Sequence, residues 1–170
     1  MAGFSFYDSI STERLTLNVV SVPDHEFVNE LVNSAGWIEF IGDRNIHSKE
    51  AAIAYIDKIR NTPNLTYWVI HVKQTQTPIG IVSWMKRNYL DHFDIGFALL
   101  PQYEKKGYAF ESAQKVLSMV MSQTEHSIIL ATTLPDNISS ISLLTKLGFQ
   151  FEKEIRNANE ALHVYSITIQ

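Results

Sequence analysis

The chain has 170 residues, of which 45% are hydrophobic and 19% are charged, a composition typical of globular proteins that excludes disordered or collagen-like chains. It contains no cysteine, which excludes disulfides, cysteine-ligated metals and a cysteine nucleophile. The net charge of −4 disfavours general nucleic-acid binding, and although it would mildly attract cationic molecules such as amines, it is also explained by solubility alone.

The first third of the chain predicts one strand followed by two helices. Residues 14–20 alternate between apolar and polar side chains, which is the pattern of a strand. Residues 22–24 end this strand and cap a first helix, while Ser48 caps a second helix that residues 61–64 end. We expect residues 36–45 between the helices to form an irregular loop.

Three strands are predicted in the middle of the chain. Residues 65–73, 79–86 and 92–100 are rich in aromatic and β-branched side chains, and Pro101 closes the last run. Because the turns between them are short, we expect an antiparallel meander.

The remainder predicts a helix over 107–123, a buried strand over 128–133, a helix over 136–147, and a final hairpin of 149–155 with 161–169. The order β-α-α-β-β-β-α-β-α-β-β indicates a mixed α/β sheet of about seven strands flanked by about four helices.

No internal repeat or linker interrupts this order, so we expect one domain over residues 1–170. The N-terminus lacks the pattern of a signal peptide, and no stretch approaches the roughly 18 apolar residues that a membrane helix needs. We therefore expect a cytoplasmic protein without a membrane partner.

The segment 101–109 joins a predicted strand to the clearest predicted helix. Free backbone N–H groups at a helix start bind anions, Gly107 allows a phosphate to approach the backbone closely, and Lys105 and Lys106 add positive charge. A single glycine before a helix is also a common turn, so a purely structural interpretation stays open. The segment matches neither the Walker A loop nor the Rossmann fingerprint.

A second segment, residues 137–149, opens another predicted helix with Asn137 and Ser140. Helix capping by Asn137 explains this segment equally well when it is considered alone.

The two segments together, in this order and at this distance, resemble the GCN5-related N-acetyltransferase (GNAT) superfamily, in particular the ribosomal-protein N-terminal acetyltransferases and their RimJ/RimL-like relatives. Further matches are residues 11–17 near the start, Ile79-Gly80 at the opening of a strand, and residues 94–97 before the loop. The likeness runs from about Thr12 to Thr168.

The resemblance implies a sheet that splays between its fourth and fifth strands, here 92–100 and 128–133, with acetyl-CoA in the gap as acyl donor. Its pantetheine would pair with the fourth strand, and its pyrophosphate would lie on the N–H groups of the loop. The residues implied to bind it are Phe97, Ala98, Leu99, Lys105, Lys106, Gly107, Tyr108, Ala109 and Asn137.

This chain departs from the family pattern in two places. Glu104 and Lys105 stand where relatives usually carry Gln or Arg and a further glycine, which would put a carboxylate near the phosphates. Leu144 stands where many relatives have a tyrosine as general acid. The resemblance therefore leaves Ser140 as the hydroxyl near the sulfur.

With no cysteine in the chain, direct attack of an amine on the thioester is favoured, and no metal is implied. Ser140 would supply a proton to the departing sulfur. His92 and Asp94, two apart on a predicted strand and hence on one face, are candidate bases, although both could simply be polar residues near a strand end.

The predicted acceptor is an amine-bearing small molecule or a protein N-terminus. Glu39 and Asp43 could attract a cationic acceptor. Five aromatic residues could line its pocket or belong to the core: Trp37, Phe40, Tyr67, Trp68 and Trp84. The alternative function is a non-catalytic acyl-CoA-binding sensor or interaction module, and analogy with the family suggests a homodimer formed through the last strands.

Overall fold

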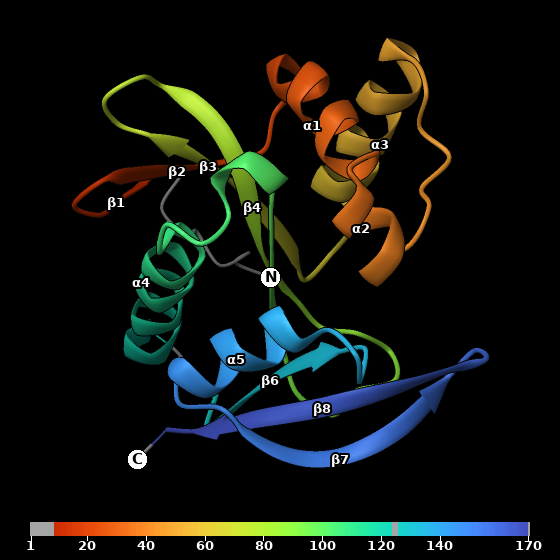
Figure 1. Ribbon diagram of the computed structural model, residues 1–170, viewed down its shortest axis with the longest axis vertical. Coiled ribbons are helices and arrows are strands. Elements are labelled where there is room, and N and C mark those ends of the chain that lie inside the picture. Colours follow the sequence, from red (N-terminus) through yellow and green to blue (C-terminus); the bar gives the residue numbers. More distant parts are fainter. Residues whose placement is uncertain (1–8, 124–125, 170) are drawn as a thin grey trace.

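The computed structural model describes residues 9–123 and 126–169 (Figure 1). Its centre is an eight-stranded sheet in the order β1-β2-β3-β4-β5-β6-β8-β7. The strands are β1 (Ser9–Ser11), β2 (Leu15–Val19), β3 (Leu65–Val72), β4 (Thr77–Met85), β5 (Asp94–Leu99), β6 (Ile128–Thr133), β7 (Gln150–Asn157) and β8 (Glu160–Thr168). The α-helices are α1 (His25–Val32), α2 (Ala35–Phe40), α3 (Lys49–Asn61), α4 (Tyr108–Gln123) and α5 (Ile138–Lys146), and the 3₁₀ turns are η1 (Val22–Asp24) and η2 (Pro101–Tyr103).

Neighbouring strands pair antiparallel throughout the sheet except at β5 and β6, which are parallel. These two strands share a single register pair, Asp94 with Leu130. The mixed, mostly antiparallel sheet and the splay between the fourth and fifth predicted strands are thereby confirmed.

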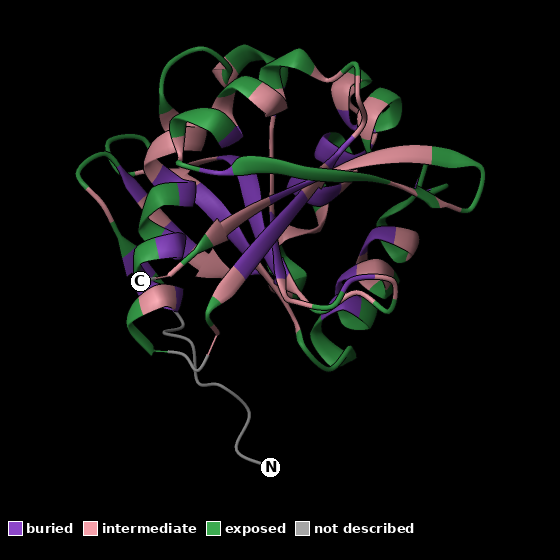
Figure 2. Cartoon of the chain, turned by 90° about the horizontal axis from the view of Figure 1, so that it is seen from below, coloured by how far each residue is buried: buried purple, intermediate pink, exposed green. Residues whose placement is uncertain are grey.

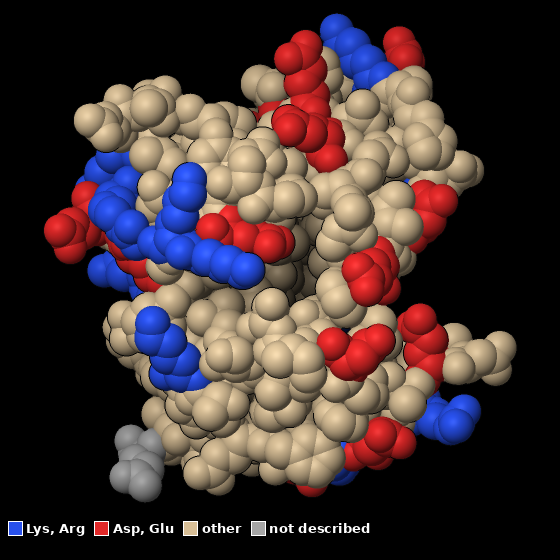
Figure 3. Space-filling model, in the orientation of Figure 1, with Lys and Arg blue, Asp and Glu red and all other residues tan. Residues whose placement is uncertain are grey.

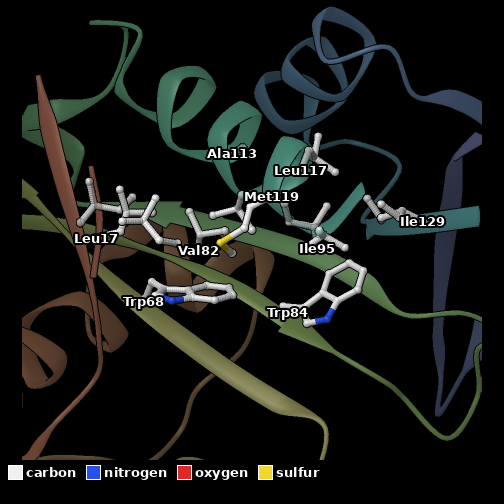
Figure 4. Packing of buried hydrophobic residues seen from close by; sticks show 14 of the residues in the cluster. Leu17, Trp68, Val82, Trp84, Ile95, Ala113, Leu117, Met119 and Ile129 are labelled. Atoms are coloured by element: carbon white, nitrogen blue, oxygen red, sulfur yellow. The ribbon is translucent and has the colours of Figure 1, made fainter. Parts of the chain in front are cut away.

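Helices cover both faces of the sheet, with α4 and α5 on one side and α1, α2 and α3 on the other (Figure 1). On the α4 side, apolar residues at helical spacing, including Ala113 and Leu117, pack onto Trp68, Ile95 and Ile129 of the sheet (Figure 4). This cluster includes residues of both β5 and β6, so its packing against α4 joins the two strands next to their shared register pair.

The opposite face has its own apolar cluster, formed by α1 and α3 with Val69 of β3 and Ile81 of β4. Val69 and its neighbour Trp68 belong to different clusters because successive side chains of a strand point to opposite faces. Buried residues accordingly concentrate in the central strands and on the inner sides of the helices, whereas β7 is exposed along most of its length (Figure 2).

The predicted elements all occur, with boundaries that differ by no more than about two residues, but two further elements were missed. The strand β1 has three residues, of which only Ile10 is buried, so it is too short to show an alternating pattern. The prediction of an irregular loop over 36–45 was wrong at its start, where α2 forms. This helix has six residues and one buried side chain, Trp37, so it carries no helical periodicity.

Among the described residues, no helix is both long and apolar enough to cross a membrane.

The contribution of the splayed junction to stability can be measured at Ile129, which is fully buried on β6. We expect Ile129→Val to lower the free energy of unfolding by about 1 kcal/mol, because it removes one buried methylene group. Urea denaturation of the variant measures this change. The control is Ile138→Val, at a side chain that is 70% exposed, where we expect almost no change. An equal loss in both variants would contradict the described packing.

Candidate active site

The central feature of the site is the gap that opens between β5 and β6. The backbone N–H of Leu130 donates to the carbonyl of Phe93 over 2.9 Å, and beyond the pair of Asp94 with Leu130 no further register pair joins the two strands in the described chain. Because the strands are parallel, their carboxyl ends lie at the same edge, and each leads towards a helix, α4 after β5 and α5 after β6. The gap therefore has two helix N-termini at its open edge.

The backbone of β5 presents hydrogen-bonding groups to this gap at alternate residues. The N–H of Leu100 donates to the carbonyl of Ile79 over 2.8 Å, so Leu100 faces β4. In an antiparallel ladder every second residue faces the same way, so Ala98 also faces β4. The N–H and C=O groups of Phe97 and Leu99 consequently point into the gap. Of the three strand residues implied to bind the cofactor, two have backbone groups available there.

The loop between β5 and α4 is tightly turned. Leu100 is buried, and both Lys105 and Gly107 have left-handed backbone angles, with φ of 59° and 81°. The carbonyl of Gly107 accepts the N–H of Glu111 over 3.0 Å, which starts the helix. The N–H groups of the first helical turn, from Tyr108 onward, have no partner inside the helix. Such a run of free N–H groups after a left-handed residue forms a concave anion site.

Glu111, in the first turn of α4, ties the helix to the start of β2. Its carboxylate accepts hydrogen bonds from the Thr12 hydroxyl at 2.6 Å, the Arg14 backbone N–H at 2.8 Å and the Arg14 Nε at 2.7 Å. Partial burial raises the pKa of Glu111, but these hydrogen bonds outweigh burial and hold the pKa below its ordinary value. Sequence reasoning noted the segment around Arg14 only as a family match and missed this contact.

The second helix start, at α5, is capped by Asn137. Its side-chain oxygen accepts the backbone N–H of Ser140 over 3.2 Å, so the capping interpretation is confirmed. The Asn137 side chain still has an amide group to donate elsewhere. Ser140 is half-buried, and no hydrogen bond engages its hydroxyl in the described part of the chain. Leu144, one turn further along, is buried in the core, so no polar group stands at that position.

The two candidate bases lie in different settings. The prediction that both occupy one strand face was wrong for His92, because β5 begins at Asp94 and His92 lies in the preceding bend. At this bend Leu90 is buried, and Phe93 stacks on Trp84 with the ring centroids 5.1 Å apart. His92 lines a small cavity beside β6 and β7.

Asp94 is almost completely buried and forms an ion pair with Arg87, whose Nε lies 2.9 Å from its Oδ2. The other carboxylate oxygen, Oδ1, is buried and has no hydrogen-bond partner within residues 9–123 and 126–169. Burial raises the pKa of Asp94, and the attraction of Arg87 opposes this effect without cancelling it. The adjacent basic pair Lys86-Arg87 was visible in the sequence, but nothing in its pattern indicated this ion pair.

The residues considered for an acceptor pocket differ in their exposure. The three tryptophans Trp37, Trp68 and Trp84 are buried in the core, Phe40 and Tyr67 are half-buried, and Glu39 and Asp43 are exposed. Basic side chains gather over the loop that precedes α4, on one side of a central hollow, with acidic side-chain atoms among them at the rim of the hollow (Figure 3). Acidic side chains lie across from them, over the end of α2 and the segment that leads into α5 (Figure 3).

Comparison with known proteins agrees with this geometry. The family model described as the acetyltransferase (GNAT) domain matches residues 14–150, which is most of the chain. The chain therefore belongs to the GNAT family and is an acetyltransferase.

Among its relatives is the uncharacterized N-acetyltransferase YnaD of Bacillus subtilis, which is 27% identical over 155 residues, covering 89% of this chain and 90% of YnaD. RimL, a ribosomal L7/L12 alpha-N-protein acetyltransferase solved in complex with coenzyme A, superposes with a TM-score of 0.82 at 15% identity, covering 95% of this chain and 98% of that chain. A spermidine N-acetyltransferase of Vibrio cholerae, solved with CoA and spermine, superposes with a TM-score of 0.77 at 18% identity, covering 93% of this chain and 97% of that chain. The two structural likenesses show the shared fold.

The contacts of Glu111 predict a stability that depends on pH. Because the folded-state pKa of Glu111 lies below its ordinary value of 4.5, the contribution of the carboxylate is complete above that pH and is lost as the pH falls through the folded-state pKa. We therefore expect Glu111→Gln to be less stable than the wild type at neutral pH, and the two proteins to converge in urea denaturation as the pH falls through the folded-state pKa of Glu111.

The matched control is Glu26→Gln, at an exposed glutamate in the first turn of α1. Its stability should follow that of the wild type at every pH. A difference between Glu111→Gln and the wild type that stays constant across the titration would contradict the role given to the carboxylate.

Proposed function

We propose that this chain transfers the acetyl group of acetyl-CoA to the primary amine of a small molecule or a protein N-terminus. The observation that carries the proposal is the gap between β5 and β6, with free backbone groups of Phe97 and Leu99 on one wall and the N-terminus of α4 at its end. Backbone groups along the gap can pair with the amides of an extended arm, and N–H donors at its end can bind an anion. The pantetheine arm and the pyrophosphate of acetyl-CoA need these two kinds of partner.

The residues present fit such a ligand. We propose that the backbone of Phe97 and Leu99 binds the amides of the pantetheine arm, with Ala98 between them turned to β4. The N–H groups from Gly107 to Ala109 would bind the pyrophosphate, with Lys105 and Lys106 adding positive charge, both exposed beside them. The side-chain amide of Asn137, which capping leaves free, would donate to the arm.

Acetyl-CoA, when bound, supplies the thioester, and the chain's own residues assist the transfer. In the reaction the amine nitrogen forms a bond to the acetyl carbon, the carbon–sulfur bond breaks, the sulfur takes up a proton and the amine gives one up. The Ser140 hydroxyl, which has no other partner, would donate to the sulfur. A backbone N–H of β5 would stabilise the negative charge that develops on the carbonyl oxygen.

The proton of the amine is proposed to pass to Asp94 or His92, directly or through a water. The Oδ1 of Asp94, which is buried and has no hydrogen-bond partner among the described residues, is the candidate proton acceptor on β5, and burial raises the pKa of this carboxyl above its ordinary value. The imidazole of His92 lies outside the strand, in the bend before it.

An amine acceptor is supported by the relatives and by the surface charge. RimL acts on a protein N-terminus and the Vibrio cholerae enzyme on spermidine, and both acceptors are amines. The acidic side chains across the hollow from the loop would attract a cationic acceptor (Figure 3). Peptide N-termini are the first acceptors to test, because an α-amine, with a pKa of about 7.7–8.0, loses its proton more readily than a lysine.

The experiment that tests the donor site is a calorimetric titration with acetyl-CoA, with ATP as the control ligand. We expect acetyl-CoA to bind with micromolar affinity, ATP not to bind, and Gly107→Asp to abolish acetyl-CoA binding. Aspartate would add a negative charge and a side chain at a position whose φ of 81° disfavours one. The matched control is Gly36→Asp in α2, where a new Cβ meets nothing within 4 Å and binding should persist. Unchanged affinity in Gly107→Asp would contradict the loop assignment.

The role of Ser140 is tested once an acceptor is found. We expect Ser140→Ala to lower kcat by about tenfold to a hundredfold while the Kd for acetyl-CoA changes little, because the hydroxyl assists the leaving group and not binding. Steady-state kinetics together with calorimetry separate the two effects. Ser139→Ala, at the exposed neighbouring residue, is the control. An equal loss of turnover and affinity in Ser140→Ala would assign this residue to binding instead.

A further inference from the structure

Arg14, just before β2, reaches across to the loop that precedes α4. Its Nε lies 2.7 Å from Oε2 of Glu111, and its Nη1 donates to the backbone carbonyl of Lys106 over 3.0 Å. The guanidinium also lies over the ring of Tyr108, 4.5 Å from its centroid. One side chain therefore contacts the last loop residue before Gly107 and the first turn of the helix that follows.

The bond to the Lys106 carbonyl determines where the next N–H points. In a planar trans peptide the C=O and the N–H point in opposite directions, so a carbonyl held towards Arg14 turns the N–H of Gly107 to the other side. The carbonyl of Gly107 is itself held by the N–H of Glu111, which orients the N–H of Tyr108 in the same way. Two successive donors of the proposed anion site are thus oriented by bonds on the opposite side of the chain.

The absence of a side chain at Gly107 leaves space for the guanidinium of Arg14. A Cβ built on Gly107 would lie 3.2 Å from Nη2 of Arg14 and would meet nothing else within 4 Å. The missing side chain therefore makes room for the guanidinium. The left-handed Lys105 adds to the need for support, because a residue with a side chain adopts this conformation only when its surroundings hold it there.

We propose that Arg14 is a positioning residue that holds the loop of residues 105–107 in the shape that binds the donor's pyrophosphate. It acts from behind the loop, through the Lys106 carbonyl, and does not contact the anion. The proposal rests on the proposed function, since it assumes that the loop binds coenzyme A.

Two simpler roles must be distinguished from positioning. Arg14 could only stabilise the fold through its ion pair with Glu111, or it could only add positive charge near the phosphates. Arg14→Lys separates these roles, because lysine keeps the charge and can keep a contact with Glu111. A single ammonium group cannot reproduce the planar fork that reaches Glu111 and the Lys106 carbonyl together.

The experiment measures the Kd for coenzyme A by calorimetry and the melting temperature of four variants beside the wild type. Arg14→Lys and Arg14→Gln test the proposal. Arg60→Gln is the structural control, because Arg60 donates to the backbone carbonyl of Val20 over 2.7 Å, a bond of the same kind away from the loop. Lys73→Gln is the charge control. The Lys73 ammonium donates to the carbonyl of Thr12, and its backbone N–H donates to the carbonyl of Arg14, so the substitution removes one positive charge from a side chain next to Arg14 in the fold.

We expect Arg14→Lys to raise the Kd for coenzyme A by about tenfold, the loss of one hydrogen bond to a charged group, and Arg14→Gln to raise it further. The increase should persist in about 0.5 M salt, where charge effects between exposed groups are screened. Arg60→Gln and Lys73→Gln should bind as the wild type does under these conditions.

Unchanged affinity in Arg14→Lys, or an equal loss in Lys73→Gln, would overturn the positioning role while leaving the proposed function intact. Failure of the wild type itself to bind coenzyme A would overturn the proposed function, and the positioning role with it. Arg14→Lys keeps the proposal testable even if Arg14→Gln does not fold.

Discussion

The site depends on a sheet that stays continuous through one residue pair and opens beyond it. Asp94 pairs with Leu130, and on the α4 side Ile95 and Ile129 belong to the same buried cluster, which joins the two halves of the sheet. The strands can therefore diverge towards their carboxyl ends without separating the molecule. A parallel pair is needed for this arrangement, because only parallel strands bring both following helices to the same edge.

An open strand edge leaves backbone groups without partners, and buried or half-buried groups of this kind favour a ligand that can pair with them. The backbone of Phe97 and Leu99 is in this position, and the first turn of α4 adds N–H donors at the end of the same strand. The binding potential of the site consequently lies mostly in the main chain. The fold that creates this edge is shared with RimL at 15% identity.

Side chains matter where they hold that main chain in place or perform the chemistry. Arg14 and Glu111 fasten the loop and the helix start from behind, and Asn137 caps α5 through the N–H of Ser140. Leu144 is buried in the core, so the hydroxyl proposed to assist the leaving group is that of Ser140.

The sequence predicts, without any structure, the order of the long elements, the mixed α/β sheet, the two segments at the starts of α4 and α5, and the family. These follow from local patterns: alternation in strands, helical spacing, capping residues and glycine before a helix. It could not reveal β1 and α2, whose three and six residues are too few to carry a period. Three features appear only in the folded chain: Asp94 faces Arg87, His92 lies outside the strand, and Arg14 reaches a carbonyl 92 residues away. Such contacts depend on which elements pack together, and no local pattern records that.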